Sequence, residues 1–350
     1  MRPLRYLIPL LTLAAVLAAC GGQATQSPPT AAPTTPPTAP VPIASPAPAA
    51  AFPVTIEQCG ETLTFTEPPQ RVIATWQSTA EVLLALGLEE RIIGVYYGQF
   101  YPSTAPGLEE AMARLDALTD GQGGAPPREV VIAAQPDFIY AAYPGSDFNA
   151  ERGRASREDL ATLGAQIFGS SADCAADAST LTVEKVYDDI RKLGLIFGVS
   201  ERAEALIAEL QGRVAAVQER VAGREPTPVI FYDGGEGPLG VYGSGLNNDM
   251  IRLAGGRNLF GDQPETYLEV GVESFADQSA AIFAIVDYEG FAGVPEEEAR
   301  AEFLFTTFPN MPASQERRSV FVPGAAFAAG IRFPEAVEIM ARAFHPDAFN

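Results

Sequence analysis

The stretch RVIATWQSTAEVLLALG, residues 71–87, decides the fold class. Its first five residues are typical of a buried strand, and the pattern of a helix follows at once. Ser78 and Glu81 have the spacing of a capping box, residues 82–86 provide the apolar face, and Gly87 is a suitable C-terminal stop. A strand that leads directly into a helix predicts a sheet with helices packed on its faces.

The same alternation continues on the C-terminal side of this stretch. The sequence predicts strands at 91–96, 137–142 and 166–168, with short helices at 129–134 and 159–163. On the N-terminal side, two short β-prone runs, at 54–56 and 62–65, flank a turn at Cys59-Gly60. This order of elements predicts a parallel sheet that is covered on both faces.

The middle of the chain changes character between residues 182 and 222. It contains no proline, and its apolar residues recur at helical spacing. Gly198 and Ser200 divide it into two helices. One apolar stripe consists of Val186, Ile190, Leu193 and Phe197, and the other of Ala205, Leu206, Leu210, Val214 and Val217.

Beyond Gly223 the alternation resumes, with strands predicted at 228–232, 281–286 and 319–322 and helices at 248–253 and 334–344. About 300 residues is near the size at which a single core divides into lobes. We therefore predict an α/β protein with two doubly wound lobes bridged by a long α-helix. The expected bounds are 53–198 for the N-terminal lobe, 199–222 for the interlobe helix and 223–350 for the C-terminal lobe.

The N-terminus has the pattern of a secretory signal that ends at a cysteine. Arg2 and Arg5 provide the positive region, and residues 7–17 form an apolar run too short to span a bilayer comfortably. Small residues before Cys20 resemble a bacterial lipobox, in which the cysteine is acylated and becomes the mature N-terminus. We expect a signal peptide at 1–19 and lipidation of Cys20, the alternative being an ordinary signal in which this cysteine is incidental.

Residues 20–52 read as a lipid anchor followed by a linker. The segment is rich in Pro, Thr and Ala and contains no charged residue, so it cannot bury a core. Its prolines favour extended conformations, which give a reach of about 90 Å. The folded part is therefore expected outside the cytoplasm, held near a membrane by its N-terminal lipid.

The charge of the mature chain excludes one class of partner. All 44 acidic residues and all but two of the 23 basic residues lie beyond the signal and linker, so the formal net charge there is −23. Nucleic acid binding needs basic patches, so nucleic acid is not an expected partner. Of the three cysteines, Cys59 and Cys174 remain once Cys20 is assigned to lipid. We predict that these two form a disulfide in an oxidising compartment, the alternative being two separate thiols.

Six segments together carry a resemblance to a known family. They resemble, in order and spacing, the iron-siderophore and vitamin B12 type periplasmic-binding proteins, which are substrate-binding subunits of ABC importers: 54–60, 65–72, 78–87, 129–137, 254–260 and 344–346. The resemblance implies a helical-backbone fold with modest closure on ligand. It also implies a monomeric binding protein whose partners are a membrane permease and its ATPase subunit.

The resemblance further assigns a docking role to one glutamate on each lobe. Glu129 and Glu273 occupy matching places, each opening a short helix before an apolar strand. In the family such residues enter basic pockets of the permease. The alternative is structural, because acidic side chains in a first helical turn also favour the helix dipole.

A doubly wound sheet binds its ligand at the carboxyl ends of its strands, and this rule selects the candidate cleft residues. Aromatic rings with a few polar groups suit a bulky metal complex. Arg332 lies in a Gly-x-Arg turn that resembles one in the family and offers a fork of donors to an anionic group. The candidates are Trp76, Gln77, Tyr96, Tyr97, Tyr143, Asp233, Glu236, Tyr242 and Arg332, and the same loops carry Gln99, Phe100, Tyr101, Asp147 and Tyr288.

Direct metal binding and catalysis are both disfavoured by the residue types present. His345 is the only histidine and sits in a His-Pro turn, so iron would have to arrive already chelated and no cofactor is expected. The run GEGPLG at 235–240 satisfies a dinucleotide-binding pattern, but Pro238 and the residues after it postpone any helix that could receive a pyrophosphate. We therefore expect a binding protein for a ferric siderophore and not an enzyme.

Several alternatives stay open at this point. The same scaffold is compatible with cobalamin, haem or an acidic cofactor precursor as ligand. A surface lipoprotein that binds a protein partner would explain the anchor but not the two-lobed pattern.

Overall fold

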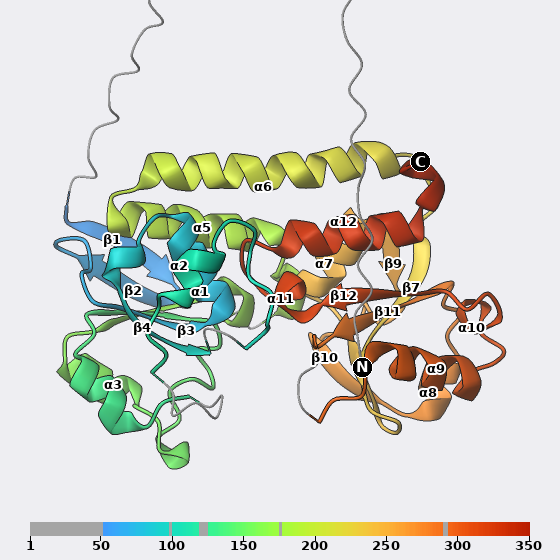
Figure 1. Cartoon of the computed structure of the whole chain (residues 1–350), viewed down its shortest axis with the longest axis horizontal. Coiled ribbons are helices and arrows are strands. Elements are labelled where there is room, and N and C mark those ends of the chain that lie inside the picture. The colour runs from blue at the N-terminus through green and yellow to red at the C-terminus, as the bar shows by residue number, and fades with distance from the viewer. Residues whose placement is uncertain (1–51, 98–99, 119–124, 175–176, 290–292) are drawn as a thin grey trace, which may run out of the picture. The chain divides into compact units, whose positions relative to one another are not determined.

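The computed structural model describes residues 52–97, 100–118, 125–174, 177–289 and 293–350 (Figure 1). The predicted signal peptide, Cys20 and all but the last residue of the linker lie outside these ranges. Residues 47–350 form one compact unit. In the described part of the chain, no helix combines the length and the apolar character that crossing a membrane requires.

The N-terminal lobe is built on a four-stranded parallel sheet, as predicted (Figure 1). In sheet order the strands are β4 (Ile92–Tyr97), β3 (Val72–Trp76), β5 (Phe138–Ala141) and β6 (Gln166–Gly169). Its helices are α1 (Gln77–Ala85), α2 (Glu109–Ala113), α3 (Arg128–Ala134) and α4 (Arg157–Thr162). A separate antiparallel hairpin precedes the sheet and consists of β1 (Val54–Gln58) and β2 (Glu61–Phe65).

The predicted capping box of the first helix is wrong. Helix α1 begins one residue before Ser78, and Trp76 is the residue at its N-cap. The Thr79 hydroxyl, three residues on, accepts a hydrogen bond from the Trp76 amide at 3.1 Å. Glu81 is instead buried and accepts from the Ala105 amide at 2.9 Å, so its carboxylate fixes a loop.

Two long helices follow the first lobe. Helix α5 (Val183–Phe197) ends at Gly198, which adopts a left-handed conformation with φ 69°. Helix α6 (Ser200–Val221) then packs on α5 and also on two helices of the second lobe, α7 and α12 (Figure 1). The buried stripe of α6 differs from the prediction at its start, because Ala203 and Ile207 are buried whereas Ala205 is exposed.

The C-terminal lobe contains a six-stranded mixed sheet. Its path runs through β10 (Tyr267–Val270), β8 (Leu239–Tyr242), β7 (Thr227–Gly234), β11 (Ile282–Asp287) and β12 (Ser319–Pro323), and β9 (Gly256–Asn258) also pairs with β7. The helices are α7 (Leu246–Leu253), α8 (Val272–Ala276), α9 (Glu297–Thr307), α10 (Pro312–Gln315), α11 (Gly324–Phe327) and α12 (Phe333–Phe344).

The antiparallel edge formed by β8 and β10 was not predicted from the sequence. The glycine-rich run at 235–240 forms the turn between β7 and β8, where Gly235 has φ 85°. A Cβ atom at Gly235 would collide with the Pro238 carbonyl, so this turn requires glycine. The run therefore builds a hairpin, and no helix begins there to receive a phosphate.

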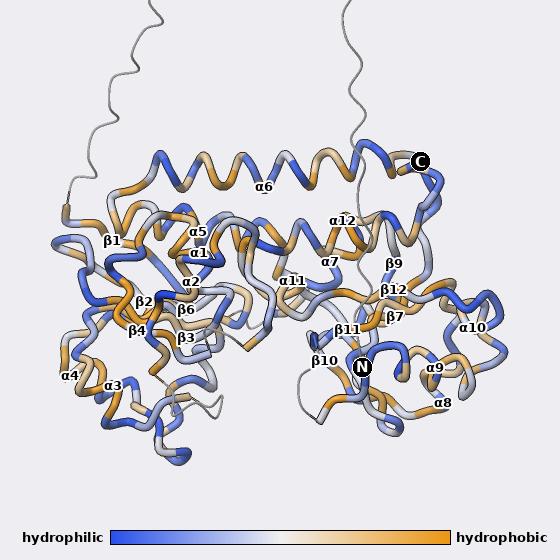
Figure 2. The backbone as a smooth tube through the Cα atoms, viewed as in Figure 1, coloured by the Kyte–Doolittle hydropathy of each residue, from blue (hydrophilic) through white to orange (hydrophobic). Residues whose placement is uncertain are grey.

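Alternating side chains of the central strands enter cores on opposite faces of each sheet, which is why the strands read as continuous apolar runs. In β3, Val72 and Ala74 join the core beneath α5 and α6, and Ile73 joins the core of the outer face. In β11, Ala284 and Ile285 divide in the same way. The inner core contains buried residues from both lobes and from α6, whose apolar positions recur along the tube in Figure 2. Both lobes are therefore doubly wound and share a core.

Candidate functional site

The N-terminal lobe presents a cluster of aromatic rings at the carboxyl ends of its strands. Trp76 ends β3 and stacks on Tyr97, which ends β4, with ring centroids 4.5 Å apart. Phe100 packs on the same indole at 4.9 Å, and Tyr143, after β5, at 5.1 Å. Tyr143 is one of the few large apolar side chains that remain exposed. We call these four residues the aromatic wall.

The C-terminal lobe presents tyrosines that are tied to a carboxylate. Asp233, near the end of β7, accepts hydrogen bonds at Oδ1 from Tyr242 at 2.9 Å and Tyr288 at 2.6 Å. Burial and the neighbouring carboxylate both raise the pKa of Tyr288. The ring of Tyr242 also packs on Phe327 and Tyr267, at 5.4 and 5.7 Å. We call these five residues the tyrosine wall.

A cavity of about 310 Å³ lies between the two lobes and is lined by both. This volume is within the range of small-molecule sites. A smaller pocket next to it contains Trp76 and Gln77 and shares four residues with it. The lining of the interlobe cavity consists of Ser78, Ala142, Tyr143, Ala172, Asp173, Leu181, Tyr242, Ser244, Leu246, Asn247, Thr266, Tyr267, Phe327, Ala328 and Ala329.

A third pocket, of about 370 Å³, lies on the C-terminal lobe beside the β7–β8 turn. Asp233 and Glu236, both predicted as cleft residues, line it together with Glu269 and Arg300. Tyr267 lines this pocket and the interlobe cavity alike, so the two spaces are neighbours.

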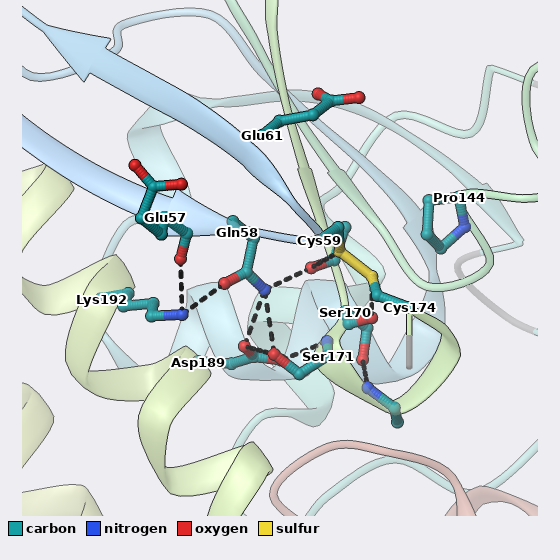
Figure 3. The surroundings of a disulfide bond; sticks show 12 residues. Glu57, Gln58, Cys59, Glu61, Pro144, Ser170, Ser171, Cys174, Asp189 and Lys192 are labelled. Carbon is teal, nitrogen blue, oxygen red and sulfur yellow. Dashed lines mark hydrogen bonds between the residues drawn. A yellow bond between two sulfur atoms is a disulfide. The ribbon is translucent and has the colours of Figure 1, made fainter. Parts of the chain in front are cut away.

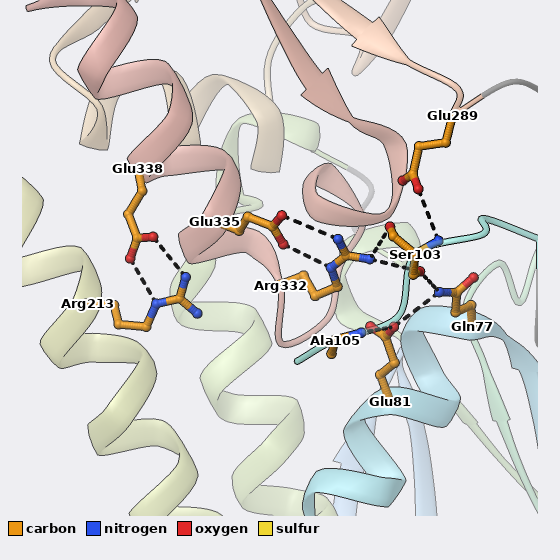
Figure 4. Close-up of polar contacts among 9 residues, drawn as sticks. All are labelled: Gln77, Glu81, Ser103, Ala105, Arg213, Glu289, Arg332, Glu335 and Glu338. Atoms are coloured by element: carbon orange, nitrogen blue, oxygen red, sulfur yellow. Dashed lines mark hydrogen bonds and ion pairs between the residues drawn. The ribbon is translucent and has the colours of Figure 1, made fainter. Parts of the chain in front are cut away.

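A segment of the N-terminal lobe crosses to the other lobe at Ser103 (Figure 4). Its carbonyl oxygen accepts from Gln77 Nε2 at 2.6 Å and from Arg332 Nη1 at 3.1 Å. Its amide donates to Glu289 Oε2 at 3.1 Å, and its hydroxyl lies 3.0 Å from Arg332 Nη1. The lobes are thus tied by polar contacts between described residues. These contacts add to the ion pair of Arg213 on α6 with Glu338 on α12.

Three of the predicted cleft residues have other roles. Tyr96 is 3% exposed and belongs to the outer core of the N-terminal lobe. Arg332 is 5% exposed and pairs with Glu335 at 3.0 Å, so its donors are used within the protein. Gln77 is 2% exposed, and its side chain holds the crossing segment through Tyr101 and Ser103. The side chains of Tyr96 and Arg332 line none of the three pockets.

Some of the remaining candidates line the spaces between the lobes, and others support the side chains that do. Trp76, Tyr143 and Tyr242 line the interlobe spaces, and Tyr97 supports the indole. Asp147 is buried and accepts from Thr75 Oγ1 at 2.7 Å, so its role is to hold the loop of Tyr143. Gln99 lies outside the described residues.

The lining also contains residues that were missed. Asp173, Asn247, Tyr267 and Phe327 all line the interlobe cavity. Asp173 could have been found, because it precedes a cysteine of the predicted disulfide. Tyr267 and Phe327 had no such signal, since they lie on a strand and a helix that the sequence pattern did not predict.

The position of Asp173 depends on the disulfide between Cys59 and Cys174 (Figure 3). The bond joins the β1–β2 turn to the loop after β6, with Cα atoms 5.1 Å apart. Beside it, Gln58 Nε2 donates to the Gly169 carbonyl at 2.6 Å and to Asp189 Oδ1 at 2.9 Å. This network fixes the loop that forms one side of the cavity.

Glu129 and Glu273 occupy matching local positions. Each lies in the first turn of a short helix, α3 or α8, that precedes an inner strand of its lobe, and each is exposed. Next to each glutamate is an exposed valine: Val130 is 38% exposed and Val272 is 42% exposed. The two lobes therefore present equivalent acidic and apolar pairs.

The described residues contain no group of three acidic, histidine or cysteine side chains placed to hold a metal ion. His345 is buried, and its Nε2 lies 2.9 Å from the Gly255 carbonyl, so it packs the end of the last helix.

Comparisons with known proteins agree with this architecture. A family model described as periplasmic binding protein matches residues 72–318. The vitamin B12-binding protein of Photorhabdus laumondii is 28% identical over 217 residues, which are 62% of this chain and 70% of that protein. That relative is a binding protein by name.

Solved structures share the fold. A periplasmic binding protein from Veillonella parvula matches with a TM-score of 0.74 at 22% identity, over 84% of this chain and 97% of that one. The structure described as an ABC-type Fe3+-hydroxamate transport system from Saccharomonospora viridis matches with a TM-score of 0.66 at 22% identity, over 84% and 99%. Because the family model covers more than half of its residues, the chain belongs to the periplasmic binding protein family.

Proposed function

We propose that this chain is the substrate-binding lipoprotein of an ABC importer, and that it carries a chelated iron compound to a membrane permease. The observation that carries the proposal is the interlobe cavity, which both lobes line at the carboxyl ends of their strands with aromatic rings and a few polar groups. Membership of the family places the chain outside the cytoplasm. ATP hydrolysis belongs to another subunit, and the ligand leaves unaltered.

The lipid anchor is part of this proposal. Acylation of Cys20 would hold the folded unit at the membrane surface, and the linker up to residue 52 would let it reach the permease. A monomer suffices for this role, since one chain provides both sides of the cavity.

A second candidate ligand is cobalamin, and a specific observation favours it. The relative from Photorhabdus laumondii is named for vitamin B12 binding, at 28% identity over 217 residues. Cobalamin needs no ligand atom from the protein, which fits a cavity lined by rings, hydroxyls and amides. A periplasmic heme binding protein from Pseudomonas aeruginosa also has this fold, with a TM-score of 0.59 at 24% identity over 79% of this chain, but a likeness at this identity supports the fold alone.

Glu129 and Glu273 are proposed as the docking residues, one for each lobe. Both are exposed carboxylates, and the exposed Val130 and Val272 beside them add apolar surface. A permease with two basic pockets would bind both sites simultaneously. Its affinity would then depend on the distance between the two lobes.

The double charge reversal Glu129→Lys with Glu273→Lys tests the docking role. Ligand uptake by cells or by vesicles with the permease should be abolished, because each lysine faces a basic pocket, whereas ligand affinity of the purified protein should be unchanged. The matched control is Glu219→Lys, an exposed glutamate on α6 whose reversal should spare uptake. Normal uptake by the double variant would remove the docking assignment.

A further inference from the structure

Among the described residues, several acidic side chains but a single basic one, Arg300, line the interlobe cavity and its two neighbouring pockets. Asp173 lines the interlobe cavity, and Asp233, Glu236 and Glu269 line the neighbouring pocket of the C-terminal lobe. No lysine, arginine or histidine occurs among the described residues that line the interlobe cavity or the smaller pocket beside it. Four internal segments are not among the described residues: 98–99, 119–124, 175–176 and 290–292. Their sequence contains no lysine, arginine or histidine either.

The arginines close to these spaces are used by the protein itself. Arg332 spends its donors on Glu335 and Ser103 (Figure 4). Arg300 lines the C-terminal pocket, but two of its nitrogens donate to the carbonyl oxygens of Asp233 and Val286, and its Nε is covered by protein atoms. Neither guanidinium is therefore free to pair with a ligand anion.

One further arginine lies at the edge of the aromatic wall. Arg154 donates to the Ser146 carbonyl at 2.9 Å and approaches the Tyr97 hydroxyl at 3.5 Å. It lines none of the three pockets. Its charge is offset by the buried Asp147 nearby, which interacts with it electrostatically.

Two oxygen atoms near the cavity are buried without a hydrogen-bond partner among the described residues. Asn247 Oδ1 belongs to the cavity lining, and Glu289 Oε1 belongs to the carboxylate that holds the crossing segment. Two nitrogen donors are in the same condition, Nε1 of Trp76 and Nε of Arg300. Unpaired buried acceptors are costly, and a ligand with N–H or O–H groups would satisfy them if the side chains shift slightly.

We propose, on the basis of the proposed function, that the interlobe cavity selects metal complexes of neutral or positive net charge that carry hydrogen-bond donors. An anionic complex would bring its charge close to Asp173 and Asp233, with no free cation to compensate it, and would lose its own hydration. This class includes neutral and amine-bearing ferric hydroxamates and cobalamin. Ferric catecholates, ferric citrate and haem with its two propionates fall outside it.

The test uses one metal core in three charge states. A ferric tris-hydroxamate with a primary amine is positive, its acetylated form is neutral, and its succinylated form is negative. The same contrast exists between cobalamin and a derivative with one peripheral amide hydrolysed to a carboxylate. Affinities follow from the fluorescence of Trp76, the only tryptophan in the chain. The negative member of a series should bind about tenfold or more weakly than the neutral one at low salt.

The variant Asp173→Asn locates the effect. It should raise the affinity for the negative member and so reduce the difference in affinity between the neutral and negative members. Glu219→Gln on α6 should change neither the affinity nor this difference. Added salt should narrow the difference in the native protein as well. Equal or tighter binding of the negative member would overturn the charge selection and leave the transport role intact. No binding of any member of either series would overturn both.

Discussion

The aromatic wall and the tyrosine wall each contribute side chains to the lining of the interlobe cavity, but they are built differently. In the aromatic wall, Trp76 is held by ring contacts with Tyr97, Phe100 and Tyr143. In the tyrosine wall, hydroxyl groups are held by the carboxylate of Asp233. The difference shows that strand topology fixes where a ligand lies, while the residues just after each strand decide which chemistry meets it.

The supports behind the walls differ as well. The loop that carries Asp173 is joined to the first hairpin by the disulfide and by Gln58. The tyrosine wall rests on main-chain pairing of β8 with β7 and β10, and the described residues of that lobe contain no disulfide. Formation of the disulfide should therefore stabilise the N-terminal side of the cavity and leave the tyrosine wall unaffected.

The largest expected effect comes from removing the disulfide with Cys59→Ala and Cys174→Ala. The bond closes a loop with a sequence separation of 115, which in the chain-entropy model is worth about 4 to 5 kcal/mol. Urea unfolding should show that loss, and reductant should bring the native protein to the stability of the variant. Hydrogen exchange should rise at residues 170–174 through local opening, and at 239–242 only as far as those amides exchange by global unfolding. Equal stability of native and variant proteins, or two alkylatable thiols in the unreduced chain, would contradict the pairing.

A second prediction compares the walls as ligand contacts. Trp76→Ala removes the ring on which the aromatic wall is assembled, and a central aromatic contact of this kind is typically worth about 2 kcal/mol or more, so affinity should fall about 30-fold. Tyr288 lines none of the three pockets, so Tyr288→Phe acts only through the lost hydrogen bond to Asp233 and should lower the ligand affinity about fivefold. Calorimetry with whichever chelate binds the native protein measures both.

The control for this comparison is Trp76→Phe, which keeps a ring at the end of β3 and should recover most of the loss. A larger effect at Tyr288 than at Trp76 would reverse the proposed division of labour between the walls.

The sequence predicts the inner strands and the aromatic wall well, for a physical reason. A strand such as β3 is buried on both faces, so its apolar run is continuous, and the residue that follows it must lie at the sheet edge. Trp76 and Tyr143 could be placed by this rule alone. The paired helices α5 and α6 were recognisable because long apolar stripes tolerate a small error, such as the one at Ala205.

The tyrosine wall was only partly predictable. Strands β8 and β10 are short, and glycines at the turn before β8 hide the hairpin pattern, so Tyr267 carried no signal. Arg332 shows a second limit: the sequence indicated a fork of donors for an anionic group of the ligand, but in the fold these donors bind Glu335 and Ser103. The burial of Tyr96 follows from period-two alternation with Val95, since Val95 joins the inner core and Tyr96 joins the core of the outer face.

The smallest expected effect concerns pH and again separates the lobes. Asp147 holds the Tyr143 loop through Thr75, and burial raises its pKa to about 6. An unfolded aspartate releases its proton near pH 4, so between about pH 4 and 6 the folded chain binds more protons, and acidification from pH 7 to 5 should stabilise the fold. The buried Asp189, with a pKa also raised to about 6, acts in the same direction.

The variant Asp147→Asn keeps an acceptor for Thr75 but cannot titrate, so it should lose about 1 kcal/mol of the stability gained between pH 7 and 5. Urea unfolding at the two pH values measures the gain, and Asp277→Asn, an exposed residue of the C-terminal lobe, should leave it unchanged. A variant at Asp147 that gained as much stability as the native chain would mean that this carboxylate is solvated. Protonation of Asp147 would then not contribute to the stability of the loop that carries Tyr143. The aromatic wall would be independent of pH in this range, because its ring contacts involve no group that titrates there.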